Sequence, residues 1–220
     1  MKNVIGRLAK QREFMIFAIV AAVAISMTFA SPYFLTVPNI LALLLGLSIE
    51  AIIVVAMCNL MVSGGFDMSV GSVLAFTSAV TASLLRSGFP VPIAILVGLI
   101  VGAVIGLING FFVTKVGLNP FVTTLSGLSL YRGLTLIVTG GQNITGLPRS
   151  FRALGQERVL EVQTPIIIAL VLIVIGDLLL RNSRFFRQYY YIGGNEKAAR
   201  LSGIRVDRLK ILAYMLTGIF

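Results

Sequence analysis

The feature that most constrains this chain is a series of apolar runs, most of them close to the length that crosses a lipid bilayer. The runs lie at about residues 14–30, 39–62, 70–85, 91–114, 119–139 and 164–180, and a last run of ten residues lies at 211–220. Because an α-helix rises about 1.5 Å per residue, ~20 residues cross the hydrocarbon core. The sequence therefore predicts an all-α integral membrane protein, a polytopic helical bundle of about six complete spans plus a truncated seventh. The last run is too short to span, so we expect the chain to be the front part of a longer protein.

The composition indicates that lipid is the solvent. Hydrophobic residues make up 57% of the chain and charged residues 12%, and the mean hydropathy is +0.98, whereas soluble domains carry roughly a quarter charged residues. The net charge of +10 does not indicate nucleic acid, because Lys and Arg lie almost entirely between the apolar runs. With no His and one Cys, the chain is expected to hold neither a transition metal nor an internal disulfide. It carries no P-loop motif and is not expected to be an enzyme.

The basic residues also predict the orientation. If the N-terminus is cytoplasmic, 13 Lys and Arg fall in inside segments and four fall outside, at positions 86, 149, 152 and 158. This asymmetry predicts a cytoplasmic N-terminus and a cytoplasmic stretch at 181–210. The segment at 63–69 has no basic residue and is either a loop or a break in one long helix at membrane depth.

That segment, Ser63-Gly-Gly-Phe-Asp-Met-Ser69, interrupts the apolar pattern with two glycines and one carboxylate. Gly64 and Gly65 release the backbone from a helix, and freed amides in a membrane must find partners or line a wet cavity. An acid is costly there, so Asp67 is a candidate for the substrate pathway, together with Gly64, Gly65 and Ser69. Alternatively, the segment is an interfacial turn in which Asp67 or Ser69 caps the following helix, which does not exclude a pathway role.

Three more polar side chains within the runs, Glu50, Thr124 and Arg132, are further pathway candidates. A lipid-facing Arg is expensive, so Arg132 is expected to point into the bundle or to reach the outer interface. A Glu50–Arg132 ion pair, or a satisfied polar contact for each, would explain both residues without a pathway role. Asp177 and Arg181 stand four residues apart in the favourable order, which predicts a local ion pair.

A face of small residues runs along the segment at 91–114. Gly98, Gly102, Gly106 and Gly110 recur every four residues, and such a face lets a second helix approach closely. We expect these glycines to serve helix packing.

The basic stretch at 181–210 differs in kind from the apolar runs. Residues 196–201 read as a short helix that opens near Asn195 and closes near Gly203. Such a helix suits docking into a groove on a soluble partner. It equally suits a helix that rests on the anionic leaflet and is held there by Arg200, Arg205 and Arg208.

Several segments resemble one family. Residues 64–72 (GGFDMSVGS) are similar to a signature of the permease subunits of sugar-type ABC importers, the ribose, xylose, arabinose and galactose group. The segments that also match the family's pattern are 105–110 (IGLING), 119–125 (NPFVTTL), 131–133 (YRG) and 193–204 (GGNEKAARLSGI). Phe66 and Met68 replace commoner, smaller aliphatic residues. Relatives of this family also carry other small polar solutes and, more distantly, branched-chain amino acids.

The resemblance implies one transmembrane permease domain over residues 1–220, in a bacterial plasma (inner) membrane, which imports a monosaccharide or similar small polar solute. The implied partners are an ABC ATPase subunit, a second permease subunit, an extracytoplasmic solute-binding protein and membrane lipid, with no nucleic acid. ATP and Mg²⁺ would be bound by the ATPase subunit, and this chain would hold no cofactor. Within 181–210, the residues expected to contact the ATPase are Gly194, Asn195, Glu196, Ala198, Ala199, Arg200, Ser202 and Gly203.

Two other functional classes compete with this interpretation. A secondary transporter driven by an ion gradient would use Glu50, Asp67 and Arg132 as its coupling groups. A membrane scaffold without transport is the third class.

Overall fold

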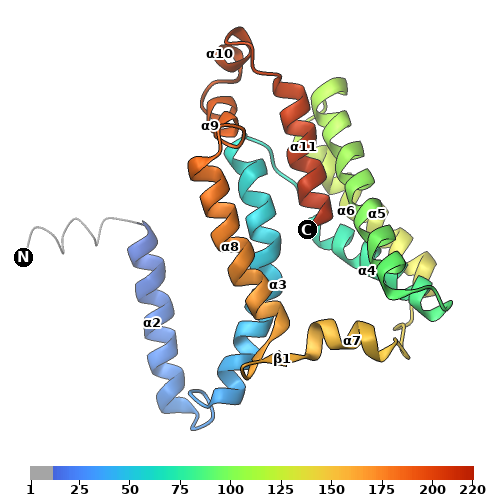
Figure 1. Ribbon diagram of the computed structural model, residues 1–220. Helices are drawn as coiled ribbons and strands as arrows, with labels where there is room; N and C mark the ends of the chain where they lie inside the picture. Colours follow the sequence, from blue (N-terminus) through green and yellow to red (C-terminus); the bar gives the residue numbers. More distant parts are fainter. Residues whose placement is uncertain (1–11) are drawn as a thin grey trace, which may run out of the picture. The chain divides into compact units, whose positions relative to one another are not determined.

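The computed structural model describes residues 12–220 and the side chains from Phe14 onward. The elements in chain order are α2 (Arg12–Ala30), α3 (Val37–Val62), α4 (Val70–Arg86), α5 (Val91–Phe111), the π-helix η1 (Phe112–Val116), α6 (Pro120–Thr139), α7 (Arg149–Gln156), β1 (Arg158–Val159), β2 (Val162–Gln163), α8 (Thr164–Asn182), α9 (Arg187–Gly194), α10 (Glu196–Leu201) and α11 (Val206–Ile219) (Figure 1). The chain forms two compact units, Met1–Gly46 and Leu47–Phe220, and the boundary falls inside α3.

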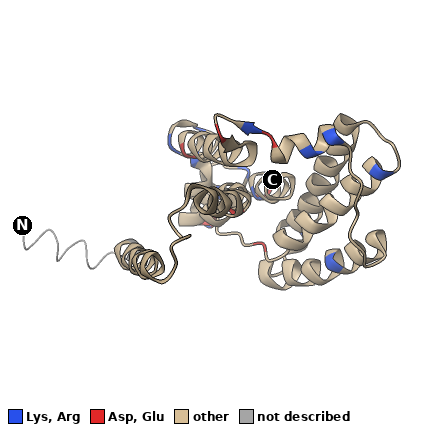
Figure 2. Ribbon diagram, turned by 90° about the horizontal axis from the view of Figure 1, so that it is seen from below, with Lys and Arg blue, Asp and Glu red and all other residues tan. Residues whose placement is uncertain are grey.

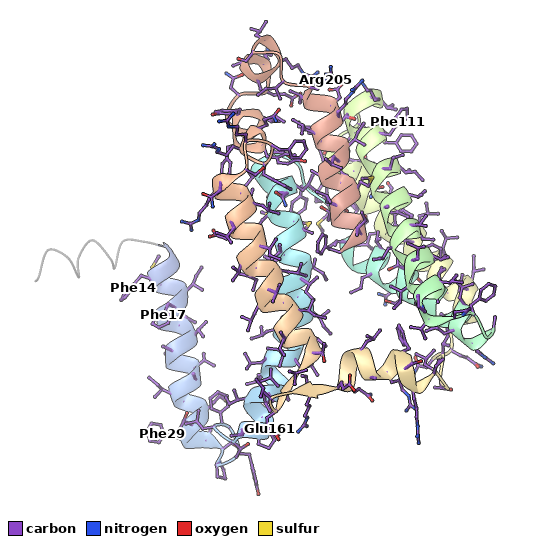
Figure 3. All side chains as sticks on the ribbon, in the orientation of Figure 1. Phe14, Phe17, Phe29, Phe111, Glu161 and Arg205 are labelled. Carbon is purple, nitrogen blue, oxygen red and sulfur yellow. The ribbon has the colours of Figure 1, made fainter. Side chains whose placement is uncertain are left out.

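In the first unit, α2 presents apolar side chains outward. Phe14, Phe17 and Phe29 are exposed and project from the helix (Figure 3). The hydroxyls of Ser26 and Thr28 donate to carbonyl oxygens four residues earlier, so both are satisfied without water. The basic residues expected to mark the cytoplasmic end of this helix lie outside the described side chains.

Four helices in the described part of the chain are long and apolar enough to cross a membrane. They are α3, α5 continued by η1, α6 and α8, and the shorter apolar helices are Phe14–Ala30 and α4. Many of their large apolar side chains are exposed, and Figure 2 shows that most of the helical ribbon carries no charged residue. The prediction of an all-α membrane protein is confirmed at this level.

Three local features differ from the sequence-based expectation. The polar stretch after α6 contains the helix α7 and a hairpin, β1–β2, in which Arg158 pairs with Gln163. Helix α9 precedes the expected short helix, and α11 begins at Val206 instead of near residue 211. The hairpin escapes sequence rules because Leu160 and Glu161, neither of them glycine, hold its turn at φ +52° and +66°.

In the second unit, α5 packs closely on α11 and on α4. A Cβ at Gly102 would overlap the carbonyl oxygen of Gly218, and one at Gly106 would overlap the carbonyl oxygen of Tyr214. At Gly110 it would lie 2.9 Å from Ile211 Cα, so the two helices run antiparallel and side by side (Figure 1). A Cβ at Gly98 would instead overlap the hydroxyl of Thr81 in α4. The glycine face thus lies at two helix contacts, chiefly the one with α11.

Two clusters of buried side chains hold this unit together. The larger one gathers residues from the end of α3 and from the three helices of the C-terminal stretch: Leu60, Tyr189, Ile192, Ala199, Val206, Leu209, Ala213 and Tyr214. The smaller joins Val73, Ile105 and Tyr131 from α4, α5 and α6. The larger cluster anchors the short helices α9 and α10 on the membrane-spanning part.

Candidate functional site

The segment between α3 and α4 is irregular and mostly buried. Gly64 has a φ of +77°, a conformation that favours glycine, whereas Asp67 is 5% and Ser69 0% exposed. The amide of Met68 donates to Thr124 Oγ1 at 3.0 Å, and Tyr214 Oη donates to the carbonyl of Phe66 at 3.1 Å. Thr124 is the fifth residue of α6 and lies about 6 Å along the helix axis from its first residue. Because Met68 bonds to α6 at this depth and not at its end, the segment is a loop buried within the bundle.

Asp67 organises the start of α4 without capping it. Its Oδ1 accepts hydrogen bonds from the amide of Ser69 at 2.7 Å and from Ser69 Oγ at 2.6 Å. Ser69 occupies the N-cap position, but its side chain accepts no hydrogen bond from the first turn. Of the two caps offered as alternatives, Asp67 or Ser69, the Ser69 side-chain cap is therefore not formed, and the Ser69 oxygen instead accepts from the side chain of Asn109.

The same hydroxyl connects α4 to two other helices. Asn109 Nδ2, from α5, donates to Ser69 Oγ at 3.0 Å, and Tyr131 Oη, from α6, lies 3.4 Å from Asn109 Oδ1. All four side chains are buried. We call Asp67, Ser69, Asn109 and Tyr131 the Asp67 cluster. Its members come from three of the segments that carried the family resemblance, which the fold brings together.

Glu50 and Arg132 are not members of the Asp67 cluster. Both side chains are exposed, and among the described residues neither forms an ion pair with the other. The suggested Glu50–Arg132 pair is thus not formed. The Asp177–Arg181 pair is confirmed, with 2.7 Å between Arg181 Nε and Asp177 Oδ1.

The C-terminal stretch forms a second candidate site, built on α9 and α10. Asn195 is the N-cap of α10, since its Oδ1 accepts from the amide of Ala198 at 3.0 Å, and Gly203 follows the helix with a φ of +83°. The expected boundaries of the short helix are confirmed. In α9, Tyr189 is fully buried and its hydroxyl donates to the carbonyl of Leu209 at 3.2 Å. Burial raises the pKa of Tyr189 to about 12, so the hydroxyl stays protonated as a donor.

The helices α9 and α10 leave a groove between them. It has a volume of about 460 Å³ and is lined by Tyr190, Tyr191, Gly194, Asn195, Ala198, Ala199, Ser202 and Ile204. Most of the residues expected to contact an ATPase are exposed, whereas Ala199 is buried in the larger core cluster. Leu201, which sequence reasoning did not single out, is 91% exposed.

A chain of ion pairs holds α10 to the membrane-spanning part. Glu196 accepts from Lys210 at 2.6 Å and from Arg200 Nη2 at 2.9 Å. Arg200 Nη2 also contacts Asp207 Oδ1 at 2.5 Å, and Asp207 Oδ2 lies 2.7 Å from Lys115 Nζ. The hydrogen bonds from Lys210 and then Arg200 lower the pKa of Glu196. We call these five residues the ion-pair chain.

Sequence reasoning identified only Glu196 and Arg200 of the ion-pair chain. Lys115 and Asp207 stand 92 residues apart, and no local pattern links them. Among the described residues, no three or more His, Cys, Asp or Glu side chains lie together where they could hold a metal ion.

Comparison with known proteins decides the family. Residues 39–220 match the family described as branched-chain amino acid transport system / permease component. The chain belongs to this permease family. It is 43% identical over 191 residues to the ribose import permease protein of Bacillus subtilis (strain 168), a match that covers 86% of this chain and 59% of the relative.

Two further relatives show the breadth of the similarity. The permease is 37% identical over 188 residues to the L-arabinose transport system permease protein of Escherichia coli K12, covering 86% of this chain and 57% of the relative. It is 32% identical over 211 residues to the D-allose transport system permease protein of the same strain, covering 96% and 64%. The permease thus spans about three fifths of the length of these relatives. No solved structure matches it.

Proposed function

We propose that this chain is the membrane-spanning subunit of an ATP-driven ABC importer that moves a monosaccharide, or a similar small polar solute, into the cytoplasm. The observation that carries the proposal is its similarity to import permeases for ribose, L-arabinose and D-allose. All three named solutes are monosaccharides. The family assignment favours this function over a carrier driven by an ion gradient and over a scaffold without transport.

The proposed site of ATPase contact is the groove between α9 and α10 together with Leu201. The groove is wide enough for a protein side chain, and Ala198 and Ser202 on its wall are small and exposed. Energy from ATP hydrolysis on the partner, which would bind ATP and Mg²⁺, would enter this chain here.

The alternative, in which α10 rests on the anionic leaflet, is less well supported. A helix held by lipid headgroups needs cationic side chains that are free to reach them. Arg200, the arginine within α10, is bonded to Glu196 and Asp207. Arg205 and Arg208, which follow α10, are exposed, so the preference for a protein partner rests on the groove and on Leu201. The exposed tip at Leu201 also suits a protein partner.

For the solute pathway, we propose different roles for the residues singled out from the sequence. Asp67 accepts from Ser69, Ser69 accepts from Asn109 of α5, and Thr124 accepts from the amide of Met68. They support the walls of the pathway and need not touch solute. Glu50 and Arg132 are exposed charges within apolar helices, and such charges face water or protein rather than lipid.

The proposed assembly completes the importer. Two permease subunits, two ATPase subunits and an extracytoplasmic solute-binding protein would work together in a bacterial plasma membrane. This chain would contribute about six spans and part of a seventh, and the excess of Lys and Arg at 115 and at 181–210 over the outside segments supports a cytoplasmic N-terminus. The stretch at 181–210 would then be cytoplasmic, where an ATPase can reach it.

Uptake by cells that express the permease with its ATPase and binding proteins tests this function. Uptake of labelled ribose, L-arabinose and D-allose is measured with and without an uncoupler while cellular ATP is maintained. We expect at least one sugar to be taken up despite the uncoupler, and the ATPase subunit to co-purify with the permease. Uptake that collapses with the ion gradient at constant ATP would instead establish a secondary transporter.

A further inference from the structure

We infer that Lys115 and Asp207 are positioning residues for coupling, which join α10 to η1 and α11 so that α10 and the α5–α11 pair move as one body. The inference rests on the proposed function, because it specifies how a displacement of α10 by the ATPase reaches the membrane. Neither residue belongs to the surface proposed to touch the ATPase.

The first observation is the connectivity of the ion-pair chain. Asp207 contacts Arg200 of α10 through one carboxylate oxygen and Lys115 of η1 through the other. Glu196, at the opposite end of α10, bonds to Lys210 of α11 at 2.6 Å. Helix α10 is therefore attached to α11 at both ends, and the attachment continues through Asp207 to the end of α5.

The second observation is the rigidity of what lies behind these ion pairs. The contact of α5 with α11 is a contact of backbones, because Gly102 and Gly106 leave no room for a Cβ against Gly218 and Tyr214. Close-packed backbones cannot slide past each other without separating. A displacement of α11 therefore carries α5 with it.

The third observation is the local structure that presents Lys115. It lies in the π-helix that extends α5, and the turn closes at Gly117, which has a φ of +79°. Short π-helical turns are rare and are frequently found at functional sites. This turn brings Lys115 Nζ to 2.7 Å from Asp207 Oδ2.

A single exposed ion pair would not carry this inference, since such pairs contribute little. Asp207 differs because its side chain is only 22% exposed and pairs with two cations from two other elements. By contrast, Leu201 of the same segment is nearly fully exposed. The partly buried carboxylate of Asp207 links α10 to η1, whereas the exposed side chain of Leu201 is available to a partner.

The test uses the permease assembled with its ATPase and binding proteins in proteoliposomes. The variants are Lys115→Gln, Asp207→Asn and the conservative Asp207→Glu, and Arg184→Gln is the matched control. Arg184 is an exposed cation that precedes α9 and forms no ion pair among the described residues. Three quantities are measured: bound ATPase subunit, ATP hydrolysis, and solute imported per ATP hydrolysed.

We expect Lys115→Gln and Asp207→Asn to retain the ATPase subunit and its hydrolysis, and to import about twofold to fivefold less solute per ATP. Asp207→Glu should restore the ratio, and Arg184→Gln should leave it unchanged. An unchanged ratio in both neutral variants overturns the inference, as does loss of ATPase binding, which would make these residues part of the docking surface. If Asp207→Asn does not reach the membrane, the half-exposed Lys115 position decides alone. A wild-type permease that binds no ATPase, or imports without ATP, overturns the proposed function itself before any variant is compared.

Discussion

Replacing Gly106 by alanine tests the contact between α5 and α11. The new Cβ would overlap the carbonyl oxygen of Tyr214 and lie 2.7 Å from Met215 Cα and 2.8 Å from the carbonyl carbon of Tyr214. All three atoms belong to the backbone of α11, so no side-chain rotation relieves the overlap. Ordinary contacts of a Cβ lie at 3.4–4 Å, so the helices must separate locally by about 1 Å.

The cost follows from this separation. Overpacking of a well-packed contact costs about 1–3 kcal/mol, and we expect about 2 kcal/mol here because the neighbours are backbone atoms. For a chain of this size each kcal/mol corresponds to about 2–4 °C in Tm, so the variant should melt about 4–8 °C lower. Gly133→Ala is the matched control, since nothing lies within 4 Å of a Cβ there. It should leave the Tm unchanged or raise it slightly, through the higher helix propensity of alanine.

The assay is a thermal melt of the purified permease in detergent, followed by circular dichroism at 222 nm. Circular dichroism is suitable because the chain has no Trp to report unfolding by fluorescence. Equal melting temperatures for Gly106→Ala and the wild type would refute the backbone contact. An equal drop in Tm for Gly106→Ala and Gly133→Ala would show that any added methyl group is harmful. The drop in Gly106→Ala would then not be due to the contact between α5 and α11.

Three further predictions concern the two candidate sites. Asn109→Leu leaves the buried Tyr131 hydroxyl without its partner and should lower the free energy of unfolding by about 1–3 kcal/mol in the same melt. An unchanged Tm would mean that the 3.4 Å contact contributes nothing. Leu201→Glu should abolish co-purification of the ATPase subunit without lowering the Tm, because the side chain is exposed; undiminished co-purification places the docking surface elsewhere. Since the pKa of Glu196 is lowered in the folded chain, its ion pairs stabilise the attachment of α10 above the ordinary carboxyl range, and this stabilisation is lost as the pH falls through the lowered pKa. The protection of the α10 amides, measured as their exchange rate relative to the intrinsic rate at each pH, should therefore be constant from neutral pH down to that range and fall below it. This fall should be absent in Glu196→Gln.

The features that sequence predicted correctly are those encoded by neighbouring residues. The boundaries of α10 follow from Asn195 and Gly203, whose side-chain bond and backbone conformation act within one turn. The ion pair of Asp177 with Arg181 is similarly a matter of helical spacing. The lengths of the apolar runs predicted the membrane-spanning helices for the same reason.

The features that sequence did not predict depend on tertiary contacts. Nothing near Asn109 indicates that it meets Ser69, 40 residues earlier, although both lie in segments that carried the family resemblance. Helix α9 is another example, since Tyr189 and Ile192 are fixed by burial against α3 and α11 and not by a cap or a periodic pattern. Glu50 and Arg132 show the converse, because the ion pair that was one of the explanations open for two charges within apolar runs is not formed in the fold.

The most direct measurement is ATP-dependent import in proteoliposomes that contain the permease with its ATPase and binding proteins and have no ion gradient across the membrane. We predict that labelled monosaccharide accumulates only when ATP and Mg²⁺ are supplied on the side of the ATPase, and that vanadate stops the accumulation. Accumulation that needs an imposed ion gradient and ignores ATP would contradict this prediction.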